Sequence, residues 1–246
     1  MTQLALVVGA ALLYFAVRGV TQGNETGAIA RGLDLLRLER SLGIDIEAGL
    51  QNSILDNRAL VTAFNWIYIW GHWPVITATL LWLHRTNRSE YTLLRNAMFA
   101  SGAIGLVIFT LYPVAPPRLL DIGMVDTVTN FSNSYRVLQP PSLVNKYAAL
   151  PSLHVGWNLL VGIAVFRSTR LKALHAMAIL GPVAVVAAVI LTANHYTIDA
   201  AAGVAVALTG LWIAHNVQHR SSGAKAGRAS RARSTRTSGT SGIDQT

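Results

Sequence analysis

The feature that most constrains this chain is the length of its uncharged, apolar stretches. Only 13% of the 246 residues are charged and 52% are hydrophobic, whereas a soluble domain carries about a quarter charged residues. The charged residues cluster, and they leave apolar stretches close to the ~20 residues that a membrane-spanning helix needs. The sequence therefore predicts an integral membrane protein.

Six such stretches predict an all-α fold, a six-span transmembrane helix bundle. They are residues 3–20, 60–83, 97–113, 150–166, 173–193 and 198–215. The first contains Arg18, which must reach the interface along its apolar stem, and a secretory signal peptide is its alternative interpretation. A retained helix is favoured because the segment has neither a basic start nor a small-residue cleavage site.

The second stretch differs from the others in its aromatic and polar residues. Trp66, Trp70 and Trp73 lie toward one end of it, together with Asn65 and His72. Clustered tryptophan is typical of the aromatic belt at a membrane–water interface. The belt is the favoured interpretation, and a ligand site is the alternative.

Residues 21–59 are too charged to cross a membrane. Leu35, Leu38 and Leu42 repeat at helical spacing, and Gly43 is a plausible helix stop. This pattern predicts helices that lie on the outer membrane surface or over the bundle. A solvated connector with some helical content is the alternative.

The C-terminal residues 220–246 are rich in Ser, Gly, Thr and Arg and show no apolar periodicity. Such a composition predicts a disordered tail, separate from a membrane domain at residues 1–219. Basic residues beside a membrane helix are attracted to anionic lipid headgroups. Nucleic acid is not an expected partner, because its binding sites normally interleave basic and aromatic residues on a folded surface.

The distribution of Lys and Arg predicts which way the bundle faces. The loops at 84–96 and 167–172 and the basic tail together carry more than half of the chain's 20 Lys and Arg residues. The positive-inside rule places them, and both termini, in the cytoplasm. The 114–149 loop, the start of the fourth span and the residues before the sixth then meet at the outer face. The plasma membrane is the expected location.

Two of these outer segments carry a histidine beside a span. In "HYTID", His195 and Asp199 are four residues apart, which puts them on one helical face, and a carboxylate there can fix the imidazole tautomer. In "PSLH", Pro151 suits a first helical turn, and Ser152 can cap the helix or bind an anion. His154 beside such an anion suits a general acid. The alternative for each motif is an ordinary capped helix start.

A third segment, "YPVAPPRLL", places Arg118 after three prolines that stiffen the exit from the third span. A guanidinium group can donate two parallel N–H bonds to the oxygens of a phosphate. Snorkelling to the interface is the alternative role for this arginine.

Arg118, "PSLH" and "HYTID", in this order on three spans, resemble the type 2 phosphatidic acid phosphatase superfamily over about residues 60–215. More narrowly, "PSLHVGW" with "HYTID" resembles the branch that contains inositol phosphorylceramide synthases and sphingomyelin synthases. The resemblance implies a metal-independent, inositolphosphotransferase-like enzyme that acts on a lipid without a cofactor. It implies that His195 forms a phosphohistidine, that Asp199 orients it and that His154 protonates the leaving oxygen.

The resemblance also implies that Arg118 and Ser152 bind phosphate, with Lys146 as an auxiliary charge. The chain departs from the family pattern at several positions. Leu111 and Val189 stand where the family has a lysine and an arginine; Leu119 and Leu153 stand where it has a proline and a glycine. A site with fewer cations suits a phosphodiester better than a dianionic monoester. A lipid phosphate or polyprenyl pyrophosphate phosphatase is the alternative within this class.

Two alternatives of another class stay open. His154, His195 and Asp199 could form the two-His-one-carboxylate metal site of a membrane hydrolase, although the helix-terminus and arginine features favour an anion. A non-catalytic membrane protein such as a transporter is the other, although the sequence shows no clear inverted repeat. Thiolate chemistry is excluded because the chain has no cysteine.

Overall fold

Helices dominate the part of the chain that the computed structural model describes, which is residues 9, 12, 24–132 and 145–238. The helices are α2 (Glu25–Leu42), α3 (Glu47–Leu55), α4 (Arg58–Trp70), α5 (Trp73–Thr86), α6 (Arg88–Leu111), the 3₁₀ turn η1 (Pro117–Leu119), α7 (Thr127–Phe131), α9 (Leu153–Ser168), α10 (Lys172–Leu191) and α11 (Thr197–Ser238). Within the described ranges there is no strand, and the all-α prediction is confirmed for them.

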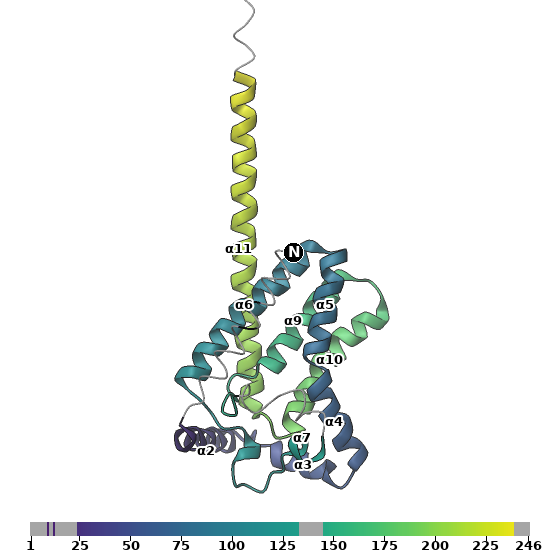
Figure 1. The fold of residues 1–246 in the computed structure, drawn as a ribbon, viewed down its shortest axis with the longest axis vertical. Coiled ribbons are helices and arrows are strands. Elements are labelled where there is room, and N and C mark those ends of the chain that lie inside the picture. The colour runs from purple at the N-terminus through teal and green to yellow at the C-terminus, as the bar shows by residue number, and fades with distance from the viewer. Residues whose placement is uncertain (1–8, 10–11, 13–23, 133–144, 239–246) are drawn as a thin grey trace, which may run out of the picture.

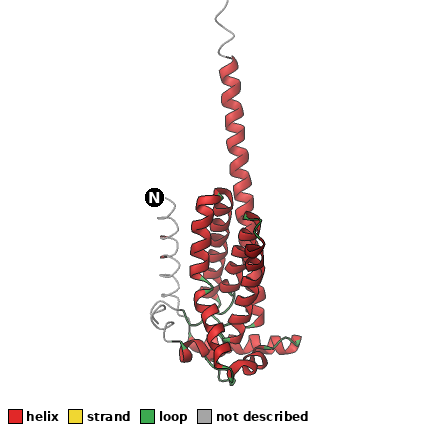
Figure 2. Cartoon of the chain, turned by 90° about the vertical axis from the view of Figure 1, so that its right-hand side faces the viewer, coloured by secondary structure: helices red, strands yellow, loops and turns green. Residues whose placement is uncertain are grey.

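The long helices form one bundle whose elements run roughly alongside α11 (Figures 1 and 2). Helix α11 packs against α6 and α9, and α9 packs against α10. The main apolar core lies between these helices and includes Phe109, Leu153, Trp157, Leu160 and Ala207. Burial of these side chains at the shared faces holds the bundle together.

Within the described part of the chain, three helical segments are long and apolar enough to cross a membrane: Arg88–Leu111, Lys172–Leu191 and Thr197–Arg220. Helix α9 is apolar but shorter. These four helices contain most of the predicted spans at 97–113, 150–166, 173–193 and 198–215. The predicted span at 3–20 lies outside the described residues, apart from Gly9 and Leu12.

The predicted span at 60–83 consists of two helices, because the chain breaks at Gly71 and His72 between α4 and α5. Pro74 explains the break. In a continuous helix its ring would clash with the carbonyl of Trp70 and remove one hydrogen bond. In the first turn of α5 the missing N–H needs no partner. The break places His72 at the start of α5.

Helices α2 and α3 lie across the end of the bundle at which α11 begins (Figure 1). Arg31 Nε donates to the carbonyl of Pro113, and the carbonyl of Ala28 accepts from Ala115 N. Gly43 ends α2 in the left-handed region at φ 68°, as predicted. Helices in residues 21–59 that lie over the bundle are therefore confirmed.

The predicted leucine stripe of α2 is only partly correct. Leu35 is buried, but Leu38 and Leu42 are 49% and 59% exposed. The buried face instead contains Leu36 and Glu39. A burial pattern centred on a carboxylate cannot be recognised from apolar spacing, and this explains the error.

Close contact between the starts of α9 and α11 fixes the end of the bundle. A Cβ atom on Gly203 would collide with the carbonyl oxygen of Ser152, and one on Gly156 would lie 2.5 Å from the carbonyl oxygen of Gly203. Ser152 N donates to the carbonyl of Asp199 at 2.9 Å. Glycine at these two positions therefore lets the first turns of both helices touch.

Helix α11 continues far beyond the bundle, to Ser238 (Figure 1). Residues 220–238 form the last part of this helix, and a basic tail at 220–246 that is separate from the membrane domain stays a prediction. The segment contains no proline, and its Ala, Arg and Lys residues are good helix formers. Residues 239–246 lie outside the described part of the chain.

Candidate active site

The predicted polar segments meet at the end of the bundle where α9 and α11 begin. His154 lies in the first turn of α9, and His195 lies in the turn that leads into α11. Their ring centroids are 6.1 Å apart and the rings are tilted by 51°. The structure therefore brings together two histidines that are separated by about forty residues in the sequence.

Two acceptors define the tautomer of His195. Its Nδ1 atom lies 2.8 Å from the carbonyl oxygen of Ala149 and 3.3 Å from Oδ2 of Asp199. Because both partners are acceptors, Nδ1 carries the proton and Nε2 carries the lone pair. Asp199 is fully buried, and its Oδ2 also accepts from Tyr196 N at 3.0 Å. These contacts fix the orientation of the imidazole ring.

Two further buried carboxylates, Glu39 of α2 and Glu47 of α3, support this turn. Oε1 of Glu47 accepts from N and Oγ1 of Thr197 at 2.7 and 2.6 Å. Oε1 of Glu39 accepts from Ile198 N at 2.8 Å. The first N–H groups of α11 are therefore satisfied by carboxyl groups from other helices.

Burial raises the pKa of Glu39 to about 8, although the hydrogen bond from Ile198 N acts in the opposite direction. The charges of Glu47 and Asp199, and a hydrogen bond with the Glu47 side chain, raise this pKa further. We infer that Glu39 is protonated at neutral pH. The sequence analysis missed both glutamates, because their partners lie about 150 residues away.

His154 is supported by an aromatic stack that the sequence analysis also missed. Its ring stacks on His72 at 4.1 Å and on Tyr68 at 4.8 Å, measured between centroids. Asn158 Nδ2 lies 3.1 Å from His72 Nδ1 and donates to the carbonyl of His154 at 2.9 Å. His72 itself could have indicated this stack, because it is a polar residue in an apolar stretch. The sequence analysis interpreted that stretch as an aromatic belt.

Both the backbone and the side chain of Arg118 are held by other residues. Its backbone N donates to the carbonyl of Ala193, two residues before His195. Its side chain, 12% exposed, forms an ion pair between Nε and Oδ2 of Asp126 at 3.2 Å. Asp126 is itself held as the N-cap of α7, where it accepts from Thr129 N. A snorkelling arginine would be far more exposed, so this geometry favours a site residue.

The other two predicted phosphate-binding residues differ in position. Ser152 is fully buried and is the N-cap of α9, with its Oγ 3.5 Å from Val155 N. Lys146 is exposed in the loop three residues before Ala149. Among the described residues, no hydrogen bond or ion pair joins Lys146 to either histidine. The described side chains also contain no cluster of three His, Asp or Glu residues that could hold a metal ion.

The fold and this site together define a class: a helical membrane protein with paired histidines and an arginine at one end of its bundle. The chain belongs to the PAP2 superfamily, whose family model matches residues 33–213. The match begins within α2, earlier than the resemblance at about residue 60, and so includes α3. No curated protein and no solved structure matches the chain. Membership supports a lipid enzyme of the phosphatase or phosphotransferase type, and members are typically phosphatases.

Replacing Glu39 with Gln should change how stability depends on pH. The raised pKa means that the folded protein binds this proton more tightly than the unfolded chain, so wild-type stability falls as pH rises from 4.5 to about 8. Glutamine keeps the acceptor for Ile198 N and can donate to Glu47, but it does not titrate. The apparent Tm of Glu39→Gln in detergent should therefore decline less than that of wild type over this range.

The control is Asp121→Asn, because Asp121 is exposed. This variant should keep the wild-type dependence on pH. An identical decline in Glu39→Gln and wild type would show that Glu39 is ionised in the folded protein.

Proposed function

We propose that the protein cleaves or transfers a phosphate-containing headgroup of a lipid through a phosphohistidine at His195, as an inositolphosphotransferase-like enzyme. The observation that carries the proposal is the pair of acceptors on His195 Nδ1. They leave Nε2 as the nucleophilic atom, and the second histidine lies 6.1 Å away. This is the arrangement of an oriented nucleophile and a neighbouring acid.

In the first step, His195 Nε2 attacks phosphorus and the bond from phosphorus to the leaving oxygen breaks. His154, in its protonated form, donates a proton to that oxygen. Asp199 and the Ala149 carbonyl stabilise the positive charge that develops on the His195 ring. In the second step, the oxygen of an alcohol or water attacks phosphorus, the bond between phosphorus and His195 Nε2 breaks, and His154 accepts the proton of the attacking oxygen. A transferase and a phosphatase share the first step and differ only in this acceptor.

The charges around the site favour a substrate of low negative charge. Arg118 is partly neutralised by Asp126, and Asp199 and Glu47 lie behind His195. Val189, which stands where the family has an arginine, is fully buried, and its carbonyl accepts from His195 N. A phosphodiester carries one negative charge, so it needs less positive charge in the site than a phosphomonoester dianion. This argument supports transfer from a phosphodiester over hydrolysis of phosphatidic acid.

The orientation follows from the positive-inside rule. We place the site on the outer face of the plasma membrane and both termini in the cytoplasm. The basic residues of α11 beyond residue 219 then lie near anionic lipid headgroups on the cytoplasmic side. A metal-dependent hydrolase and a non-catalytic homologue are the competing functions, and the first test below separates them.

His195→Ala should abolish turnover, and His154→Ala should lower kcat by about 10²–10⁴-fold, the usual contribution of a positioned acid–base group. Phosphate release and new lipid products would be measured together on a panel of lipid phosphomonoesters, pyrophosphates and phosphodiesters. Turnover should survive chelators and fall with vanadate. His215→Ala, an exposed histidine elsewhere on α11, is the matched control. Loss of activity with chelators would favour the metal-dependent hydrolase, and no turnover of any substrate would favour a non-catalytic protein.

Arg118→Lys should lower kcat/KM by about 10²–10³-fold, because a single lost transition-state donor is worth about 3–4 kcal/mol and a point charge cannot replace a two-pronged fork. Wild type should act faster on lipid phosphodiesters than on phosphatidic acid. Arg170→Lys, at an exposed arginine after α9, should have no effect. If phosphatidic acid or a polyprenyl pyrophosphate is the best substrate and Arg118→Lys is silent, the protein is a lipid phosphatase and Lys146 is the next cation to test.

A further inference from the structure

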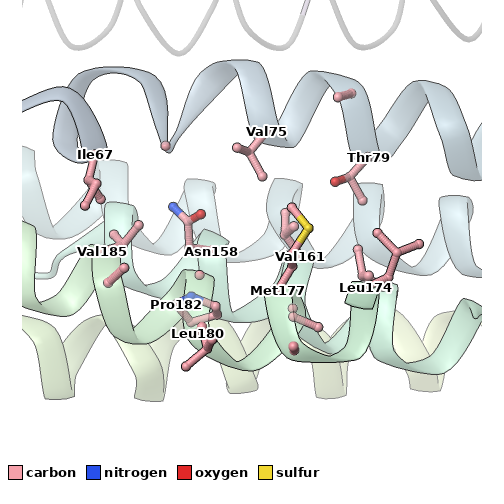
Figure 3. Close-up of a pocket in the computed structure, with 18 of the residues that line it drawn as sticks. Ile67, Val75, Thr79, Asn158, Val161, Leu174, Met177, Leu180, Pro182 and Val185 are labelled. Atoms are coloured by element: carbon pink, nitrogen blue, oxygen red, sulfur yellow. The ribbon is translucent and has the colours of Figure 1, made fainter. Parts of the chain in front are cut away.

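An apolar cavity of about 930 Å³ lies between α4, α5, α9 and α10 (Figure 3). We call it the lateral groove. Its walls include Ile67, Val75, Val161, Met177, Leu180 and Val185, and none of its lining residues is charged. Such a lining suits a hydrocarbon chain and offers nothing to a polar headgroup.

The groove runs along the membrane-spanning helix α10. Figure 3 shows Ile67 and Val185 at one end and Leu174 and Thr79 at the other. On a helix, the distance from Leu174 to Val185 is about 16 Å. Helix α10 ends at Leu191, close to His195, so the end at Val185 is the one nearer the two histidines. The groove therefore leads away from the site into the depth of the membrane.

At the end of the groove near Val185, residues that line the groove also support His154 or adjoin a residue that does. Asn158, a lining residue, donates to the carbonyl of His154 and contacts His72 Nδ1. Ile67, another lining residue, precedes Tyr68, on which the His154 ring stacks. A chain in the groove would thus lie directly beside the residues that position the proton donor.

We propose that the lateral groove holds one hydrocarbon chain of the lipid whose phosphate reacts at His195, and that it sets the preference for chain length. The proposal rests on the proposed function. Met177 and Leu180 of α10, which line the groove, are more than 60% exposed, so a chain can enter from the surrounding bilayer. Bilayer hydrocarbon is as apolar as the groove, so the gain comes from packing and orientation and not from leaving water.

Gly181 allows a direct test. It lines the groove, and no atom lies within 4 Å of the position its Cβ would take. Gly181→Phe therefore starts its side chain in open space at the wall of the groove. Val183→Phe is the matched control, because Val183 is 60% exposed on the same helix and does not line the groove.

The measurement compares phosphodiester donors that share a headgroup and carry short or long acyl chains, with bis(p-nitrophenyl) phosphate as a chainless substrate. Wild type and Val183→Phe should prefer the long-chain donor by at least about tenfold, the scale of discrimination by apolar pockets. Gly181→Phe should lose this preference. Detectable turnover of the chainless substrate shows that the variant is folded, and Gly181→Leu serves as a milder variant.

An unchanged chain-length preference in folded Gly181→Phe would overturn the proposal. Failure of the proposed function is a separate result, namely no turnover of any donor by wild type. In that case a phospholipid with a diazirine near the middle of its chain tests the groove by photolabelling and mass spectrometry. Labelling of α10 residues that line the groove in wild type, reduced in Gly181→Phe, supports the groove. No labelling there in wild type overturns it.

Discussion

The contact between the first turns of α9 and α11 is the constraint on which the rest of the structure depends. Ser152 N donates to the Asp199 carbonyl, and Gly203 packs against the Ser152 carbonyl without room for a side chain. His154 follows Ser152 by two residues, and His195 precedes Asp199 by four. This backbone contact therefore determines the distance between His154 and His195, and with it the chemistry that the two rings can perform.

Around this contact, the surrounding elements fix the orientation of each ring. Helices α2 and α3 supply the carboxyl groups that hold the turn after His195. The break between α4 and α5 supplies the stack beneath His154. The same break borders the lateral groove. A lipid held by its chain and its phosphate would therefore touch elements that the sequence separates widely.

The parts of the site that the sequence predicts are local. The spacing of His195 and Asp199 and the capping pattern around Ser152 depend on neighbours within one helical turn, and the structure has these local features. Glu39, His72 and Asp126 were missed because each acts through a partner at least eight residues away in sequence, in another element. The break near Pro74 shows the same limit at the level of the fold: hydropathy locates an apolar stretch but not the residue at which its helix breaks.

The central claim is that His195 carries the phosphoryl group during turnover. The direct measurement is rapid quenching of the enzyme with a phosphodiester donor labelled with ³²P at the phosphate, followed by peptide mapping. The account predicts a base-stable, acid-labile label on the peptide that contains His195, and no such label in His195→Ala. Stable turnover with label on another residue, or full activity in His195→Ala, would contradict it.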